Sequence, residues 1–168
     1  MQPETPFNFN TALEQGMPVR FTWLRDAEQV YGADGLATGT AQSAGIDLRA
    51  CLDSDESELE PGARLAIGSG IAVEPLVPWL AGFVYSRSGL GALRGLTVSQ
   101  GVGVIDPDYR GEIIVSLLNT SGEIRHIRKG DRIAQLVFQP FIRPHLEYAR
   151  QLGNTDRGAG GFGHTGNH

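Results

Sequence analysis

Residues 101–113 read Gly-Val-Gly-Val-Ile-Asp-Pro-Asp-Tyr-Arg-Gly-Glu-Ile, an apolar run that leads into an acidic turn and out again. Apolar runs on both sides of such a turn predict a β-hairpin. Pro107 suits the second position of the turn because its ring fixes φ. Gly101 and Gly103 are unfavourable in a strand unless a ligand or another backbone comes close. The stretch therefore indicates that Asp106 is held beside an open slot as a candidate general base. The alternative is an ordinary turn that satisfies its own backbone.

Short apolar runs separated by turn residues continue along the rest of the chain, which contains 23 Gly and 9 Pro. Long helical periodicity is absent, so the pattern favours an all-β sandwich or barrel. The one helix that we expect is short and lies at 86–94, and the acidic segment 53–60 is expected to form a loop. The expected strands cover residues 19–24, 44–51, 64–67, 71–74, 81–85, 113–118, 123–127, 132–138 and 144–149.

The length of 168 residues fits one domain with a sizeable core. We expect a β-domain at 17–150, preceded by a loose N-terminal extension at 1–16. Residues 151–168 are rich in Gly and contain few side chains that could join a core. We therefore expect them to form a C-terminal arm that is mobile in the absence of ligand.

The composition limits the partners and the environment. A net charge of -5 and a pI of about 5.3 argue against a surface that wraps nucleic acid. No apolar run is long enough to span a bilayer, so no membrane partner is expected. Cys51 is the single cysteine, which excludes an internal disulfide and favours a reducing, cytoplasmic location. The four histidines show no pair at the spacing of a zinc site.

Arg87, Ser88 and Gly89 open the short expected helix. The N-terminus of a helix exposes backbone N–H groups and the positive end of the helix dipole, which favours phosphate. Arg87 and the Ser88 hydroxyl would add donors. The alternative is a capped helix with an arginine on the surface.

A second candidate anion site lies in the glycine-rich segment 157–166. Its glycines let backbone amides approach an anion, and Arg157 and Thr165 add a charge and a hydroxyl. Phe162 is the one large apolar side chain there, and a nucleobase could stack on it. The segment is no Walker A loop because the Lys-Ser/Thr ending is missing. The alternative is a glycine tail without a function.

Two polar side chains stand within expected apolar strands. Gln135 follows Ile133 and Ala134, and an amide at that position implies a hydrogen-bond partner unless it faces solvent. Asp47 lies between Ile46 and Leu48, and the pattern does not decide whether it points inward or outward.

Five segments in chain order resemble the five motifs of the trimeric dUTPase family. They read AGIDLRA at 44–50, RSGLG at 87–91, GVIDPDYRG at 103–111, GDRIAQL at 130–136 and RGAGGFGHTG at 157–166. Each motif alone is a weak signal, but five in order at family-like spacing are specific. The resemblance runs from about Pro18 to the end of the chain.

The resemblance implies a jelly-roll-like β-barrel with one short helix and a flexible Gly-rich C-terminal arm. It implies a homotrimer with three active sites shared between subunits. The implied reaction is the Mg²⁺-dependent hydrolysis of dUTP to dUMP and pyrophosphate, in which water attacks the α-phosphorus. That reaction supplies dUMP for thymidylate synthesis and keeps uracil out of DNA.

The resemblance also implies roles for the residues around the turn. Asp106 would orient and deprotonate the attacking water. Tyr109 would pack against the deoxyribose and leave no room for a 2′-hydroxyl. The backbone around Val104 and Ile105 would read the uracil edge. Gln100 stands where many bacterial relatives have an Asn that contacts uracil, and its longer amide could reach the base or point away.

The remaining implied roles concern the triphosphate, the metal and the base. Asp47 would lie near a hydrated Mg²⁺ and contact it through water, while the ion is held mainly by the substrate phosphates. Phe162 would stack on uracil when the arm closes. The residues implied to bind phosphates are Arg87, Ser88, Gly89 and Gln135, together with Arg157, Gly163, His164 and Thr165 of the arm.

Two other functions have to be weighed. A dCTP deaminase shares the implied fold, but that family has a catalytic Glu where this chain has Ser116, and Gly-Phe where this chain has Asp108 and Tyr109. Without that Glu the deamination lacks a proton carrier. A trimer that only senses nucleotide would not need both Asp106 and the arm, although an additional regulatory role stays open.

Overall fold

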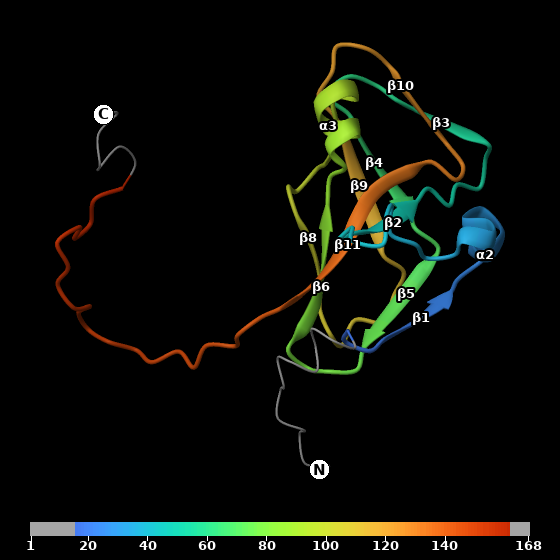
Figure 1. Ribbon diagram of the computed structural model, residues 1–168. Helices are drawn as coiled ribbons and strands as arrows, with labels where there is room; N and C mark the ends of the chain where they lie inside the picture. The colour runs from blue at the N-terminus through green and yellow to red at the C-terminus, as the bar shows by residue number, and fades with distance from the viewer. Residues whose placement is uncertain (1–15, 162–168) are drawn as a thin grey trace.

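The computed structural model describes residues 16–161, which form a β-rich body and an arm that extends away from it (Figure 1). Within this range no helix is both long and apolar enough to cross a membrane. The helices are α2 (Ala27–Tyr31), the 3-10 helix η1 (Gly32–Asp34) and α3 (Ser88–Arg94). The strands are β1 (Val19–Trp23), β2 (Ile46–Arg49), β3 (Glu56–Leu59), β4 (Arg64–Gly68), β5 (Ile71–Pro75), β6 (Leu80–Tyr85), β7 (Leu96–Val98), β8 (Gly103–Ile105), β9 (Ile114–Asn119), β10 (Arg125–Arg128) and β11 (Arg132–Pro140).

The strands form four antiparallel sheets. The largest has the order β2-β11-β6-β8, and the next has the order β4-β9-β7. Two pairs, β1-β5 and β3-β10, complete the set. One apolar core takes side chains from both larger sheets, among them Leu48, Val84, Ile133 and Leu136 from the first and Ile67, Leu96, Val115 and Leu117 from the second. The prediction of an all-β, jelly-roll-like fold is confirmed.

The predicted hairpin at residues 101–118 is wrong. β8 pairs with β6, whereas β9 pairs with β4 and β7, so the acidic turn carries the chain from one sheet to the other. The crossing is fixed at Ile113, which is fully buried. Its N–H donates to the Ile71 carbonyl at 2.9 Å, and its carbonyl accepts from the Ser69 N–H at 3.0 Å. The turn is therefore anchored to the start of β5 rather than to its own ascending strand.

Two further predictions about strands are wrong. The segment expected to be an acidic loop contains β3, which pairs with β10. Its glutamates face solvent in alternation with Leu59, which is buried, and Glu56 accepts hydrogen bonds from Arg128 and His126. The segment 144–149, expected as the last strand, has no strand partner in the described structure and is exposed. The last strand is β11 instead.

The structure contains a second α-helix beside the expected one. α3 begins after Arg87 and ends at Gly95, whose φ of 67° is the left-handed conformation that favours glycine. α2 was not expected because five residues are too few for a helical pattern to be read. It nevertheless buries Ala27 and Tyr31 in the core.

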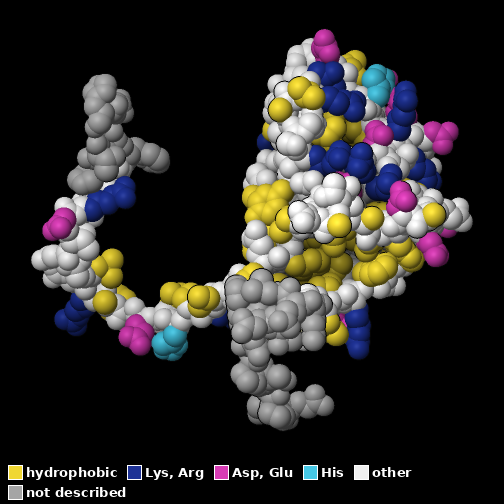
Figure 2. Space-filling view, viewed as in Figure 1, with side chains coloured by type: hydrophobic (Ala, Val, Ile, Leu, Met, Phe, Trp, Pro, Cys, Tyr) yellow, Lys and Arg dark blue, Asp and Glu magenta, His cyan; other side chains and the backbone are white. Residues whose placement is uncertain are grey.

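The chain leaves the body after Pro140 and continues as an extended arm (Figures 1 and 2). The arm carries four large apolar side chains that are almost fully exposed. Their exposed fractions are 92% for Ile142, 86% for Leu146, 90% for Tyr148 and 83% for Leu152. Such exposure is unusual for side chains of this size.

Candidate active site

The residues around the acidic turn line a pocket of about 250 Å³, called here the turn pocket. β6, β8 and β9 supply its walls, and the turn closes one end. Its lining consists of Val84, Gln100, Gly103, Val104, Ile105, Asp106, Tyr109, Glu112 and Ile114. Four of the residues predicted from the sequence to contact uracil, deoxyribose or the attacking water therefore come together with Asp106 in one cavity.

Gly101, before β8, and Gly103, the first residue of β8, have different reasons for being glycine. Gly101 has a φ of 81° and donates its N–H to the Val98 carbonyl at 3.0 Å, so it serves a turn. A Cβ on Gly103 would lie 3.2 Å from the Val84 Cβ, so this glycine lets β8 approach β6 closely. The sequence correctly indicated a close approach at Gly103, but the neighbour is protein rather than ligand.

Asp106 directly follows β8 and is exposed. Its carbonyl accepts from the Tyr109 N–H at 3.1 Å and closes the turn, while Pro107 is buried beneath it. Among residues 16–161 no group donates a hydrogen bond to the Asp106 carboxylate. A carboxylate that is fixed by its backbone and free at its oxygens can accept a proton from water.

Tyr109 folds back over the turn and forms one wall of the pocket. Its hydroxyl donates to the Glu112 carbonyl at 3.0 Å. A Cβ on Gly111 would lie 2.6 Å from the Tyr109 Cζ and 3.0 Å from Cε2. The ring therefore packs directly on the backbone of Gly111, and a larger residue there would push the ring away from this position.

Arg110 holds the turn from the outside. Its Nη1 donates to the carbonyl oxygens of Pro107 at 2.7 Å and of Tyr109 at 3.1 Å. Its Nη2 lies 3.4 Å from a carboxylate oxygen of Glu74 on β5. Arg110 and Glu112 were not predicted to have a role, although both belong to residues 101–113. Their bonds to Glu74 and to Gly70 join segments far apart in the chain and could not be read from spacing.

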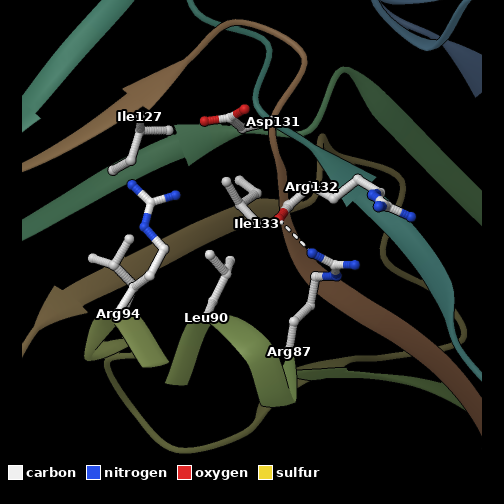
Figure 3. Close-up of a pocket in the computed structure, with 8 residues that line it drawn as sticks. Arg87, Leu90, Arg94, Ile127, Asp131, Arg132 and Ile133 are labelled. Atoms are coloured by element: carbon white, nitrogen blue, oxygen red, sulfur yellow. Dashed lines mark hydrogen bonds between the residues drawn. The ribbon is translucent and has the colours of Figure 1, made fainter. Parts of the chain in front are cut away.

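A second group of charged side chains surrounds Asp47, which is 8% exposed. The Arg87 Nε donates to its Oδ1 at 2.9 Å, and the Arg132 Nη1 donates to its Oδ2 at 3.1 Å. Arg87 also donates from Nη1 to the Arg132 carbonyl at 3.3 Å (Figure 3). Asp47 thus points inward and orients two arginines. Arg132 was missed as a site residue, although it belongs to the fourth motif.

Arg87 also lines a second cavity, of about 190 Å³, between α3 and the start of β11 (Figure 3). In this arginine pocket Arg87, directly before α3, and Arg94, the last residue of α3, lie on either side of Leu90 (Figure 3). Its lining consists of Arg87, Leu90, Arg94, Leu96, Ile127, Asp131, Arg132 and Ile133. Three guanidinium groups against one carboxylate give this pocket a positive rim, which suits an anion.

The other predicted phosphate-binding residues that the structure describes do not line the arginine pocket. Ser88 and Gly89 are exposed at the start of α3. Gln135 stands opposite Asp47 across the β2-β11 pair and opposite Tyr85 across the β6-β11 pair. Arg157 is exposed on the arm, where its Nε donates to the Gly160 carbonyl at 2.9 Å. The predicted residues Phe162, Gly163, His164 and Thr165 lie outside the described residues.

The turn pocket and the arginine pocket share no lining residue. One chain therefore does not bring Asp106 and Arg87 into the same described cavity. Nor does it supply a ready metal site: within residues 16–161 no three His, Cys, Asp or Glu side chains come together around one point. Asp47, the residue predicted to lie near a metal, uses both carboxylate oxygens to accept from arginines.

Ser116 lies on β9 at the position where a deaminase would need a glutamate. Its hydroxyl accepts a hydrogen bond from the Ser99 hydroxyl at 2.8 Å, and its carbonyl accepts from the Ser99 N–H at 2.8 Å. This position thus offers a hydroxyl that is already paired and no carboxyl group. This arrangement gives no support to the deaminase alternative.

Comparison with known proteins gives a consistent result. Residues 33–166 match the family model described as dUTPase. A deoxyuridine 5'-triphosphate nucleotidohydrolase from Desulfitobacterium hafniense is 47% identical over 127 residues, which cover 76% of this chain and 83% of the relative. The solved structure of a mutant dUTPase from Staphylococcus bacteriophage 80alpha with dUpNHpp has a TM-score of 0.74 at 24% identity and covers 89% of this chain and 98% of that one.

A second solved structure, of a mutant dUTPase from phage phi11 of S. aureus, concerns the coordination of a structural Mg(II) ion. It has a TM-score of 0.66 at 22% identity and covers 82% of this chain and 99% of that one. At these identities the two phage proteins establish a likeness of fold. The family assignment rests on the match of the family model and on the bacterial relative.

Proposed function

The chain belongs to the dUTPase family, and on this premise we propose that Asp106 is the general base of a dUTP diphosphatase whose active sites are shared between the subunits of a homotrimer. The reaction is the hydrolysis of dUTP to dUMP and pyrophosphate. The observation that carries the proposal is the turn pocket, in which an unpaired carboxylate and an aromatic wall face one cavity. The dUMP formed would supply thymidylate synthesis, and the removal of dUTP would keep uracil out of DNA.

The nucleoside would bind along β8. This strand is at the edge of its sheet, with β6 on one side and no strand of residues 16–161 on the other. Alternate backbone N–H and C=O groups of an edge strand are free to bind a ligand. The backbone around Val104 and Ile105 would read the uracil edge, with the Gln100 amide beside it. The Tyr109 ring would cover the deoxyribose face and exclude a 2′-hydroxyl.

The chemical step would begin with a water molecule bound to the Asp106 carboxylate. That water attacks the α-phosphorus, a new P–O bond forms, and its proton passes to Asp106. The bond between the α-phosphorus and the oxygen that bridges to the β-phosphorus breaks, and pyrophosphate leaves with that oxygen. The turn is fixed by Arg110, so the carboxylate would not need to be reoriented during the reaction.

The phosphates would bind to Arg87, Ser88, Gly89 and Gln135 of a neighbouring subunit. Asp47 holds Arg87 through Nε, which leaves part of the guanidinium for the ligand. Mg²⁺ fits as an ion carried mainly by the triphosphate, because Asp47 already accepts from two arginines and could contact the ion only through water. When bound, the ion neutralises charge on the phosphate oxygens.

The separation of the two pockets supports a shared site, since a complete site would then combine the turn of one chain with the arginines of another. The arm supports the same arrangement, because it extends away from its own body with apolar side chains exposed (Figure 2). In this proposal residues 17–150 are the β-domain, 1–16 an N-terminal extension and 151–168 a lid. Arg157, Phe162, Gly163, His164 and Thr165 of the lid would close over base and phosphates.

The decisive experiment offers the purified protein dUTP and dCTP with Mg²⁺ and measures pyrophosphate and ammonia. We expect pyrophosphate and dUMP from dUTP, and no ammonia from dCTP. Release of ammonia from dCTP would support the deaminase alternative instead.

Light scattering should give about three times the chain mass of 18.1 kDa, and a fully active monomer would contradict the shared site. A cytoplasmic location agrees with the single cysteine, which is free and buried.

A further inference from the structure

We propose that Glu112, held in place by Arg25, is a positioning residue that fixes Tyr109 and thereby sets the preference for deoxyribose over ribose. The inference rests on the proposed role of Tyr109 as the wall that excludes a 2′-hydroxyl. Glu112 lines the turn pocket but follows the last residue of the third motif, and Arg25 lies before the first motif. Neither residue has a role in the chemical step described above.

Glu112 contacts Tyr109 through its backbone. The Tyr109 hydroxyl donates to the Glu112 carbonyl at 3.0 Å, while the ring rests on Gly111. The position of the ring is therefore set by the path of residues 111 and 112. Any shift of Glu112 moves the acceptor of the Tyr109 hydroxyl, and with it the wall of the pocket.

The Glu112 side chain fixes that path from the other side. Its Oε1 accepts from the Gly70 N–H at 2.7 Å, just before β5, and also pairs with the Arg25 Nη2. The Glu112 side chain is 22% exposed and that of Arg25 is 43% exposed, so the carboxylate is the more shielded partner of this charge-assisted hydrogen bond. A side chain on Gly68 would overlap both the Arg25 guanidinium and the Glu112 carboxylate. The fold thus leaves space at Gly68 that the ion pair fills.

Arg25 is itself held in a fixed conformation. Its φ of 54° is left-handed, and it is the one described residue other than glycine with a positive φ. Such strain persists only where surrounding contacts fix the residue. Its Nη1 donates to the Cys51 carbonyl at 3.3 Å and lies 3.6 Å from Asp53. The hydrogen bond to Glu112 raises the pKa of Arg25, so the guanidinium stays charged.

A continuous set of contacts therefore connects Arg25, just after β1, to Tyr109, the proposed wall of the deoxyribose site. Arg25 fixes the Glu112 carboxylate, the Glu112 backbone fixes the Tyr109 hydroxyl, and Tyr109 faces the pocket. A wall that must reject one oxygen atom has to be placed to a fraction of an ångström, because small displacements of binding groups have large effects on selectivity. Loss of the Arg25–Glu112 pair should therefore reduce the discrimination against ribonucleotides more than it reduces activity toward deoxyribonucleotides.

The test compares Glu112→Ala, Glu112→Gln and Arg25→Met with the wild type. The first readout is kcat/KM for dUTP divided by that for UTP. The second is the ratio of the dissociation constants of dUMP and UMP, measured by calorimetry. We expect Glu112→Ala and Arg25→Met to lower both selectivity ratios about tenfold. Glu112→Gln should stay close to the wild type, since its amide oxygen can still accept from Gly70 and Arg25.

The matched control is Glu56→Ala, which removes a carboxylate that pairs with Arg128 at 3.0 Å on β3, outside the turn pocket. This variant should keep the wild-type ratios. Equal loss of activity toward dUTP and UTP in Glu112→Ala and Arg25→Met, or unchanged dUMP and UMP ratios, would overturn the proposal. If Glu112→Ala fails to fold, Arg25→Met decides. If the wild type does not hydrolyse dUTP, the proposed function fails, and the dUMP and UMP ratios still decide this inference.

Discussion

The turn around Asp106 and the arm after Pro140 are assigned to the same reaction, yet the molecule builds them in opposite ways. The turn is tied to distant strands by bonds such as that from the Ile113 N–H to the Ile71 carbonyl at 2.9 Å and that from the Gly70 N–H to the Glu112 carboxylate at 2.7 Å. In the arm, four large apolar side chains between Ile142 and Leu152 are at least 83% exposed, and the hydrogen bonds that link its described residues to one another join near neighbours, such as Arg157 and Gly160.

This difference separates two kinds of contribution to function. A group that activates water has to be in place before substrate arrives, so its surroundings are packed. A lid contributes only when it docks, so it can be left without contacts to its own body. Changes to the groups that hold the turn should therefore alter stability and chemistry together. Changes to the arm, or to the unpaired Asp106 carboxylate, should alter chemistry alone.

The largest effect is expected from Asp106→Asn. Asn keeps the shape of the side chain and removes the base, so turnover of dUTP should fall by about 10²-fold or more while the melting temperature stays unchanged. Asp108→Asn, on the same turn but outside the lining of the turn pocket, is the matched control and should keep most of the turnover. A greater loss in Asp108→Asn than in Asp106→Asn would mean that the base is misassigned.

Truncation of the arm at Gly153 should have the next largest effect. Turnover of dUTP should fall at least about tenfold because the site can no longer close and exclude water. The melting temperature by circular dichroism should barely change, since no residue of the removed segment that the structure describes, up to 161, belongs to the core. Phe162→Ala should reproduce part of the loss, because base–aromatic stacking contributes about 1–3 kcal/mol. Full activity in the truncated protein would show that the arm is not a lid.

Two glycine variants compare the turn and the arm directly. Gly111→Ala places a Cβ 2.6 Å from the Tyr109 Cζ, so the ring must move; because Tyr109 is 44% exposed and can swing outward, we expect a loss of only about 1 kcal/mol in the free energy of unfolding, together with lower activity. Gly153→Ala meets nothing within 4 Å and should change neither quantity. Urea unfolding measures the first effect. Equal stability of the two variants would contradict the idea that the turn is the packed region.

The smallest effect concerns alkaline pH. The Tyr31 hydroxyl donates to the Ser69 carbonyl at 3.0 Å beneath the anchor of the turn, and burial raises the pKa of Tyr31 from 10.0 to about 12. Its contribution to stability is complete below pH 10.0, where the unfolded tyrosine starts to ionise, and is lost as the pH rises through about 12. By about pH 11 the loss should be about 1 kcal/mol.

Tyr31→Phe lacks this titration, so its unfolding free energy should depend less on pH between 10.0 and about 12 than that of the wild type. Urea unfolding over this range makes the comparison. The chain truncated at Gly153 should follow the wild type, since the effect belongs to the turn and its anchor. Parallel curves for the wild type and Tyr31→Phe would show that Tyr31 ionises as easily when folded as when unfolded.

Sequence patterns predicted most of the strands because short apolar runs between turns leave few alternatives to an all-β fold. They failed where pairing is decided by distant partners. The turn around Asp106 was expected to join two strands of a hairpin, but Ile113 bonds to Ile71 and Ser69 and sends the chain into another sheet. Likewise, β3 was hidden in an acidic segment because β10 supplies the Arg128 and His126 partners of Glu56.

Prediction of the candidate active site also failed where contacts come from distant parts of the chain. The motifs identified Asp106, Tyr109, Gln100 and the strand at Val104 and Ile105, which the structure brings into one pocket. They gave no sign that the lone aspartate in β2 would orient two arginines. They also gave no sign of the contacts that anchor the turn, since these link residues more than 40 positions apart, such as Glu112 and Gly70.

The central proposal is that Asp106 of one chain and Arg87 of another form a single active site. The direct test is to co-express Asp106→Asn and Arg87→Gln chains with different tags and to purify the hybrid oligomers. Each variant alone should be nearly inactive, while the purified hybrid trimers should recover roughly a third of wild-type turnover, because one of the three sites in each hybrid combines an intact turn with an intact arginine. Purified hybrids with no more activity than either parent would contradict the shared site.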